Sequence, residues 1–379
     1  MHWSLVILFL STASGLATAR YAKRALDCTR WYRNLTCFIE DRTILSTSSE
    51  EEGDDHQSPP VTFPAQAAQL ILDSCVVFPF SVQLFAALDG GSTAFLTLKG
   101  GYVPVVAFRS DSLNSLRIDH TNLHDFTISP VENRNLNTLI VSGNPLAAVP
   151  PTVRYLTGLS ILDLSNNELE SVSLNCFESM GNLLVLDLSA NRIARVDLLP
   201  TLRLPRLKNL WINQNRLREL NHFPDFAPQL HRVRLIENRW SCAWVQRVRA
   251  AIWVADVQVY GAEYGCPEKV DGGLCCYDEC DECDDDERTE RRYQIVNVNS
   301  EPEEASVELV ELQTTPPAPR RDDGWGDNRL KQPHEVTEQH HRGAGDREPP
   351  HGSHFMDTVW QLESTVKRIE AELNGRRSG

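Results

Sequence analysis

The sequence lacks an excess of basic residues. It holds 37 Lys and Arg against 52 Asp and Glu, a formal net charge of −15 over 379 residues. Nonspecific binding to nucleic acid or to an anionic membrane needs a basic surface, so the composition argues against both classes of function. The sequence also lacks a phosphate-binding loop and a nucleophile beside a base, and His334-Glu335 and His340 do not have H-E-x-x-H spacing. It therefore predicts no enzyme, no catalytic residue, no metal and no cofactor.

Long hydrophobic runs are missing as well. The apolar run from Trp3 to Leu10 is far shorter than the roughly 20 residues that a membrane-spanning helix needs. Small residues follow it and end in Ala17-Thr18-Ala19, which has the A-x-A form of a signal-peptide cleavage site. We therefore expect residues 1–19 to be a signal peptide and the mature chain to be secreted, without a membrane span.

The chain does contain an internal repeat. The template L-x-x-L-x-L-x-x-N-x-L starts at six positions spaced 23 or 24 residues apart, with Thr121 replacing Asn in the first repeat. Two weaker repeats precede these, one around Leu70 and one around Leu96, with Cys75 at the Asn position of the earlier one. This periodicity predicts an α/β solenoid, a leucine-rich repeat horseshoe, over residues 67–240. The six starts are Leu113, Leu136, Leu159, Leu183, Leu207 and Leu230.

Each repeat should contribute a short strand with its leucines inside and the neighbouring side chains on a solvent-facing concave side. An exposed Trp beside an Arg is typical of binding hot spots, so Trp211, Arg234 and Glu237 form the predicted partner-binding site. The alternative is that Trp211 packs over the flank of the solenoid. The side chains expected on the concave side are Arg117, Asp119, His120, Ile140, Ser142, Asp163, Ser165, Asn166, Asp187, Ser189, Trp211, Asn213, Gln214, Arg234, Ile236 and Glu237.

Residues 20–66 are expected to form an N-terminal cap. Cys28 and Cys37 lie just before the repeats, and the oxidising compartment favours a disulfide between them. Asn34-Leu35-Thr36 is an N-glycosylation acceptor, so we expect Asn34 to be glycosylated. The acidic stretch from Ser46 to Pro60 is expected to be a disordered loop.

Residues 241–293 are expected to form a Cys-rich C-terminal cap. It should begin with a helix that carries Trp244, Val245, Val248 and Ile252 on one face. Adjacent Cys275 and Cys276 rarely pair with each other, so each needs another partner. The C-x-x-C of the last two cysteines permits a metal site, but the acidic surroundings and the oxidising compartment favour disulfides. Six cysteines allow 15 pairings: Cys242, Cys266, Cys275, Cys276, Cys280 and Cys283.

The tail divides into two parts. Residues 294–352 are rich in Pro, charge and His and lack apolar spacing, which predicts a disordered linker. Residues 353–375 show steps of three and four between apolar positions, which predicts a short coiled-coil helix, with a packing or frayed helix as the alternative. The seam residues are Phe355, Val359, Leu362, Val366, Ile369 and Leu373.

The order of these segments, with the Cys275-Cys276 doublet, resembles that of the leucine-rich immune proteins of mosquitoes. The resemblance implies a haemolymph protein that pairs through disulfides and binds a thioester-containing, complement-like protein. Two features depart from the pattern. Trp244 stands where extracellular leucine-rich repeat caps commonly carry a second Cys, and the coil is shorter than is usual in the family.

Two functions compete at this stage. The first is a secreted protein-binding scaffold of insect innate immunity, and the second is a secreted leucine-rich repeat protein of development or extracellular matrix that binds a protein ligand. We also expect a disulfide-linked homodimer or heterodimer with a related chain, formed through the segment from Cys275 to Cys283. The alternative is that all six C-terminal cysteines pair within the chain.

Overall fold

The computed structural model describes residues 25–33, 35–45, 61–261, 273–277 and 293–299. All of them lie in the first of two compact units, Met1–Thr314. Several predicted features fall outside the described residues. They are the signal peptide at 1–19, Asn34, the acidic loop at 46–60, Cys266, Cys280, Cys283, the linker from residue 300 onward and the coiled-coil helix at 353–375.

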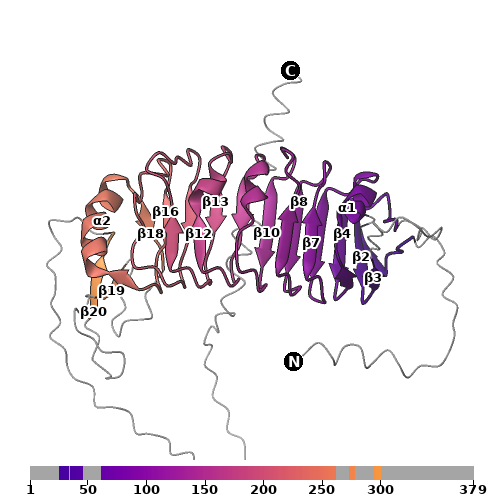
Figure 1. Ribbon diagram of the computed structural model, residues 1–379, viewed down its shortest axis with the longest axis horizontal. Helices are drawn as coiled ribbons and strands as arrows, with labels where there is room; N and C mark the ends of the chain where they lie inside the picture. The colour runs from indigo at the N-terminus through magenta and orange to yellow at the C-terminus, as the bar shows by residue number, and fades with distance from the viewer. Residues whose placement is uncertain (1–24, 34, 46–60, 262–272, 278–292, 300–379) are drawn as a thin grey trace, which may run out of the picture. The chain divides into compact units, whose positions relative to one another are not determined.

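One sheet runs along the repeats. Its eleven strands follow chain order, and every neighbouring pair is parallel except β1 and β2 (Figure 1). The buried residue at the fourth template position of each repeat lies in register with that of the next repeat, as Leu162 does with Leu186. The strands are β1 (Arg30–Tyr32), β2 (Thr36–Glu40), β4 (Gln69–Asp73), β6 (Phe95–Lys99), β8 (Ser115–Asp119), β10 (Thr138–Ser142), β11 (Ile161–Asp163), β13 (Val185–Asp187), β15 (Asn209–Trp211), β16 (Arg232–Arg234) and β18 (Gln258–Val259).

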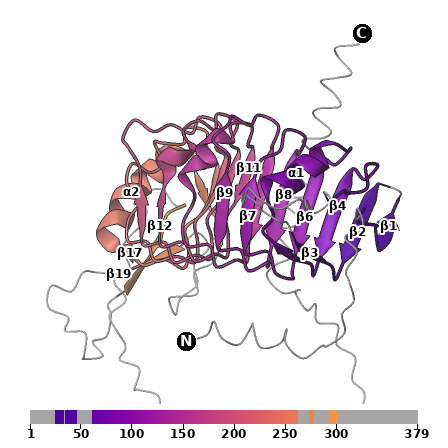
Figure 2. The ribbon, with the colours of Figure 1, turned by 45° about the vertical axis from the view of Figure 1, so that its right-hand side comes forward.

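The return segments of the coils hold little helix. Short parallel strand pairs, one α-helix and two 3₁₀ helices lie on the side opposite the long sheet (Figure 2). These elements are β3 (Thr43–Leu45), β5 (Val76–Phe78), α1 (Val82–Asp89), β7 (Val105–Phe108), β9 (Asp125–Ile128), η1 (Pro151–Tyr155), β12 (Ser171–Ser173), η2 (Leu174–Phe177) and β14 (Arg195–Asp197). Among the described helices, none has the length and apolarity needed to cross a membrane.

The repeat template builds a continuous core, which confirms the predicted solenoid. Its leucines are buried, and its asparagines link successive coils. Asn191 shows the pattern: its Oδ1 accepts a hydrogen bond from the backbone N–H of Leu169, and its Nδ2 donates to the carbonyl oxygen of Leu164. Because each coil completes the hydrogen bonds of its neighbour, these residues have a structural role.

The solenoid begins earlier than residue 67. β2 pairs in parallel with β4, and Cys37 and Ile39 are buried like the strand leucines of later coils. Asp41, two residues after Ile39, has a φ of 53°, the left-handed conformation that recurs at the same place in the template repeats, as at Asn166, two residues after Leu164. The N-terminal cap therefore contains a complete coil. The repeat template does not reveal it, because Cys37 and Ile39 replace the template leucines.

Both ends carry disulfide-bonded caps, as predicted. Cys28 is bonded to Cys37, with a Cα–Cα distance of 5.4 Å, and Cys242 is bonded to Cys276, at 4.8 Å. The C-terminal cap consists of β17 (Trp240–Ser241), α2 (Cys242–Val254), β19 (Gly273–Tyr277) and β20 (Tyr293–Asn297).

The C-terminal cap extends past residue 293. β20 pairs antiparallel with β19 over its whole length, and Val298 is fully buried. The Asn299 side chain then donates to the carbonyl oxygen of Val259 and accepts a hydrogen bond from its N–H. The expectation that a linker starts at 294 is wrong, because β20 belongs to a three-stranded sheet of the cap with β17 and β19, and Asn299 is bonded to the last strand of the long sheet.

Candidate binding surface on the strand face

The structure brings Trp211 and Arg234 together on the solvent-facing side of the long sheet, which we call the strand face. The two residues lie in register on β15 and β16, and the guanidinium carbon of Arg234 lies 5.2 Å from the centroid of the Trp211 ring. Val233, between Arg232 and Arg234, is fully buried, so both arginines point out of the strand face. Trp211 therefore lies on the strand face beside Arg234 and does not pack over the flank of the solenoid.

A second cation–aromatic pair lies beside the first. The guanidinium carbon of Arg232 is 5.8 Å from the centroid of the Tyr260 ring. Tyr260 directly follows β18, which adds a strand beyond the last template repeat. Tyr260 is not among the predicted site residues, because no template leucine marks its coil. The alternation of buried Val257 and Val259 was the available signal.

Glu237, the third residue of the predicted site, lies in the turn beyond β16. Its φ is 57°, and its carbonyl oxygen accepts a hydrogen bond from the N–H of Asn215. Its backbone therefore belongs to the left-handed turn between coils, whereas Trp211 and Arg234 lie within strands. The strand-face geometry favours Arg232 and Tyr260 as the neighbours of the predicted pair.

Four side chains expected in solvent are buried instead: Ile140, Asp163, Asp187 and Ile236. Parallel strands lie only about 4.8 Å apart, so a short side chain is covered by larger ones on adjacent strands. Asp163 and Asp187 lie in register on β11 and β13. Their Oδ1 atoms accept hydrogen bonds from the N–H groups of Ser165 and Ser189, both at 2.8 Å.

Burial makes these two carboxyl groups hard to ionise. Burial first, and the charge of Asp163 second, raise the pKa of Asp187 to about 8, while hydrogen bonds from Ser189 and the charge of Arg234 oppose the shift. Burial likewise raises the pKa of Asp163. At neutral pH Asp187 therefore holds its proton, and it presents a neutral group beside Trp211.

A second polar cluster is centred on Asp119. Its Oδ1 contacts Nδ1 of His120 at 2.7 Å and accepts from Oγ of Ser142 at 3.0 Å, and its Oδ2 pairs with Arg117 at 3.2 Å. Burial opposes ionisation, but these partners hold the pKa of Asp119 below its ordinary value. The side chains of His120 and Ser142 both bind the carboxylate, and the two residues are joined through the backbone, where the His120 N–H donates to the Ser142 carbonyl oxygen. Their side chains are therefore not arranged as a nucleophile and its base. Within the described ranges, no group of His, Cys, Asp and Glu could hold a metal ion.

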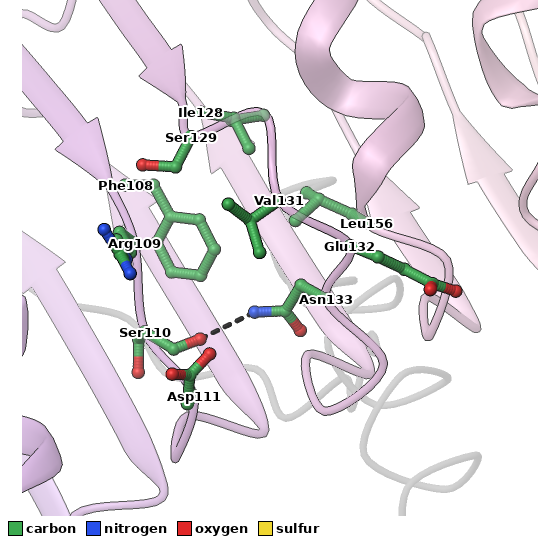
Figure 3. Close-up of a pocket in the computed structure, with 10 residues that line it drawn as sticks. All are labelled: Phe108, Arg109, Ser110, Asp111, Ile128, Ser129, Val131, Glu132, Asn133 and Leu156. Atoms are coloured by element: carbon green, nitrogen blue, oxygen red, sulfur yellow. Dashed lines mark hydrogen bonds between the residues drawn. The ribbon is translucent and has the colours of Figure 1, made fainter.

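A shallow pocket lies on the opposite side of the coils, where β7, β9 and η1 end (Figure 3). Asn133 donates from Nδ2 to the carbonyl oxygen of Ser110 at 2.6 Å, and its Oδ1 accepts from the N–H groups of Asn135 and Leu136. Its amide is thus used to tie neighbouring coils together.

The described cysteines have distinct environments. Cys75 is a free, buried thiol whose Sγ donates to the carbonyl oxygen of Ile39 at 3.3 Å, which replaces the bond made by Asn in later coils. Burial raises the pKa of this thiol. Cys176 is free and partly exposed in η2. Cys276 pairs with Cys242, and Cys275 is disulfide-bonded as well. The adjacent cysteines therefore do not pair with each other.

Comparison with known proteins agrees with this architecture. A family model described as leucine rich repeat matches residues 134–193. The fold is that of a leucine-rich repeat protein. The matching model indicates no enzyme family.

Curated relatives match only part of the chain. Tsukushi of Rattus norvegicus is 35% identical over 120 residues, which cover 30% of this chain and 34% of that protein. Oligodendrocyte-myelin glycoprotein of Homo sapiens is 28% identical over 138 residues, 36% of this chain and 31% of that protein. Toll-like receptor 2 type-2 of Gallus gallus is 30% identical over 131 residues, 34% of this chain and 16% of that protein. The chain thus spans about a third or less of these relatives.

Two solved structures overlay on parts of the repeats. The leucine-rich repeat domain of APL1 is 18% identical, with a TM-score of 0.40, and the match covers 59% of this chain and 67% of that one. The leucine-rich repeat domain of APL1B is 17% identical, with a TM-score of 0.42, and the match covers 58% and 78%.

Proposed function

We propose that this chain is a secreted protein-binding scaffold of insect innate immunity, which binds a complement-like or other immune partner through its strand face and its C-terminal region. The observation that carries the proposal is the stacking of exposed Arg234 over partly exposed Trp211 on adjacent strands of the sheet. Aromatic and Arg side chains held on a firm surface bind a protein at a low cost in conformational entropy.

The immune assignment rests on the order of the sequence segments. A leader, a Cys-pair cap, repeats, a cap with adjacent cysteines, a linker and a short coil resemble the leucine-rich immune proteins of mosquitoes. On this proposal the protein circulates in haemolymph, Asn34 is glycosylated, and a thioester-containing protein is one candidate partner. The disulfide-bonded caps are consistent with an oxidising extracellular fluid.

Affinity purification tests the proposal. The full chain is added to native body fluid, and captured proteins are identified and compared with those captured by the Trp211→Ala/Arg234→Ala variant. We expect an immune protein that the variant loses, with a cost of about 2 kcal/mol or more, which is typical of a hot spot. An identified partner that binds both proteins equally would place the binding surface elsewhere.

A second function uses the same surface: a role in development or extracellular matrix, with a protein ligand. Tsukushi matches the chain at 35% identity over 120 residues and Toll-like receptor 2 type-2 at 30% over 131 residues, so sequence similarity favours neither function. Expression after infection separates the two functions, because only the immune function predicts that infection induces the chain.

A further inference from the structure

We infer that the C-terminal end of the strand face binds an acidic peptide, a segment of a partner protein whose carboxylates are bound by Arg232 and Arg234. The inference rests on the proposed function and names the chemistry of the partner. The surface that carries it, which we call the arginine patch, consists of Trp211, Arg232, Arg234 and Tyr260.

The two guanidinium groups are positioned before any ligand arrives. Each lies near an aromatic ring of a neighbouring coil, at 5.2 Å for Arg234 over Trp211 and 5.8 Å for Arg232 over Tyr260. Contact with a ring limits the motion of the long side chain and leaves the N–H groups at the guanidinium edge able to donate to a carboxylate. A ligand then needs to order less of the surface, which favours binding.

The positive charges of the arginine patch are not neutralised by ion pairs with nearby acidic side chains in the described part of the chain. None of the ion pairs among the described residues involves Arg232 or Arg234. Lys208 and His231 are exposed at the start of the same two strands, where the N–H of His231 donates to the carbonyl oxygen of Lys208. Residues 201–261 hold ten Lys and Arg against four Asp and Glu, although the chain as a whole is acidic. This segment is therefore the basic part of an acidic protein.

Buried Asp187 supports the same chemistry. It lies in register with Trp211 on the adjacent strand, and the positive charge of Arg234 acts to lower its pKa. Because burial keeps this carboxyl group protonated at neutral pH, it neither neutralises Arg234 nor repels an incoming carboxylate. The fold thus places a carboxylic acid beside the arginine patch without placing a negative charge there.

Other polyanions fit the surface less well. A nucleic acid or a sulfated glycan carries a long run of charge and needs a long basic surface. Across the strands, the residues in register with Arg234 are Trp211 and then the buried acids Asp187 and Asp163, so the basic surface ends after one strand. The chain as a whole also carries a net charge of −15. A short acidic segment matches the size of the arginine patch, and the aromatic rings offer it apolar contact.

Fluorescence anisotropy with the full chain tests the inference. The probe is a short fluorescein-labelled peptide in which Glu alternates with Ser, and the control probe has Gln in place of Glu. We expect only the Glu peptide to bind, and the Arg232→Gln/Arg234→Gln variant to bind it about thirtyfold more weakly, as loss of a hot spot implies. Arg33→Gln/Arg154→Gln is the matched control, because it also removes two positive charges and both arginines lie over a ring, Tyr32 and Tyr155, outside the arginine patch. It should leave binding unchanged.

Three results would overturn the inference. Equal loss in the Arg33→Gln/Arg154→Gln variant would show a net-charge effect. Tighter binding of heparin or a single-stranded oligonucleotide than of the Glu peptide would assign the arginine patch to a polyanion. Tighter peptide binding after the chain's own run from Asp278 to Glu287 is changed to Asn and Gln would assign the arginine patch to that run. Failure of the Glu peptide, with the native partner still lost by Trp211→Ala/Arg234→Ala, would refute the acidic chemistry and leave the proposed function standing.

Discussion

Asp187 shows how a repeat position acquires properties that its own sequence does not carry. The Leu-Asp-Leu-Ser of its strand occurs twice, and both Asp residues were expected in solvent. Burial between neighbouring strands raises the pKa of Asp187 to about 8. The repeat template predicted which leucines are buried. It could not predict this burial, because the covering side chains belong to adjacent coils.

Replacing Asp187 with Asn should stabilise the protein at neutral pH. The folded-state pKa lies above the unfolded value of about 3.9, so folding takes up a proton and stability falls as pH rises from about 4 to about 8. Asn keeps an oxygen that accepts the hydrogen bonds from Ser189, and it is neutral, so folding does not have to protonate it. At 1.36 kcal/mol per pKa unit, the gain at pH 7 is on the order of a few kcal/mol.

Urea unfolding at several pH values measures this effect. The difference between Asp187→Asn and wild type should grow between pH 4 and 8, whereas Asp197→Asn, at an exposed acid, should change little. A constant difference across this range would show that Asp187 is ionised in the folded protein.

Gly101 occupies the Asn position of its coil and has a φ of 71°. A Cβ there would lie 2.1 Å from the carbonyl oxygen of Cys75. We expect Gly101→Ala to destabilise the protein by about 1–3 kcal/mol or more, because it adds backbone strain and a clash with the preceding coil. Gly181→Ala is the control, since nothing lies within 4 Å of its added Cβ. Equal urea midpoints for the two variants would show that a side chain at position 101 is tolerated and that Gly101 is not required there.

At the scale of elements, the C-terminal cap was predictable only in part. The α2 helix follows from the spacing of Trp244, Val245, Val248 and Ile252, and all four are buried as expected. β19 and β20 were missed because a Cys doublet beside an acidic run resembles a loop. Their position depends on the Cys242–Cys276 bond and on Asn299, which is distant in sequence from its partner Val259.

Trp244 should be the main packing residue of this cap, in the place where a second cap Cys is common. Its ring stacks on Trp240 at 4.2 Å, and its Nε1 donates to the carbonyl oxygen of Leu220 at 3.1 Å. We expect Trp244→Ala to cost about 3–5 kcal/mol, the range for losing a buried Trp. Trp253→Ala, at the exposed end of α2, should cost much less in the same thermal unfolding measurement. Similar losses for both would mean that α2 adds little to the core.

At the scale of the molecule, the repeats and caps were predictable from the sequence. The expected disulfide-linked dimer was less predictable, because it depends on which C-terminal cysteines are already bonded. Cys276 is bonded within the chain, and Cys275 is also disulfide-bonded. The expected disulfide-linked dimer therefore cannot use Cys276 without breaking the cap. This moves the prediction to Cys280 and Cys283, which lie in an acidic run.

We expect the secreted chain to migrate as a dimer without reductant and as a monomer with it. A coil of about three heptads is marginal alone, but it reinforces a disulfide on the same two chains by raising effective concentration. The acidic run favours a less acidic, related partner over self-pairing, because like charges repel. Changing Cys280 and Cys283 to Ser should abolish the dimer band, and deleting residues 355–373 should weaken it. Cys176→Ser, at a free and partly exposed thiol, should leave it intact. A monomer band in both lanes, unchanged by the deletion, would mean that the remaining cysteines pair within the chain and that the protein acts as a monomeric binding module.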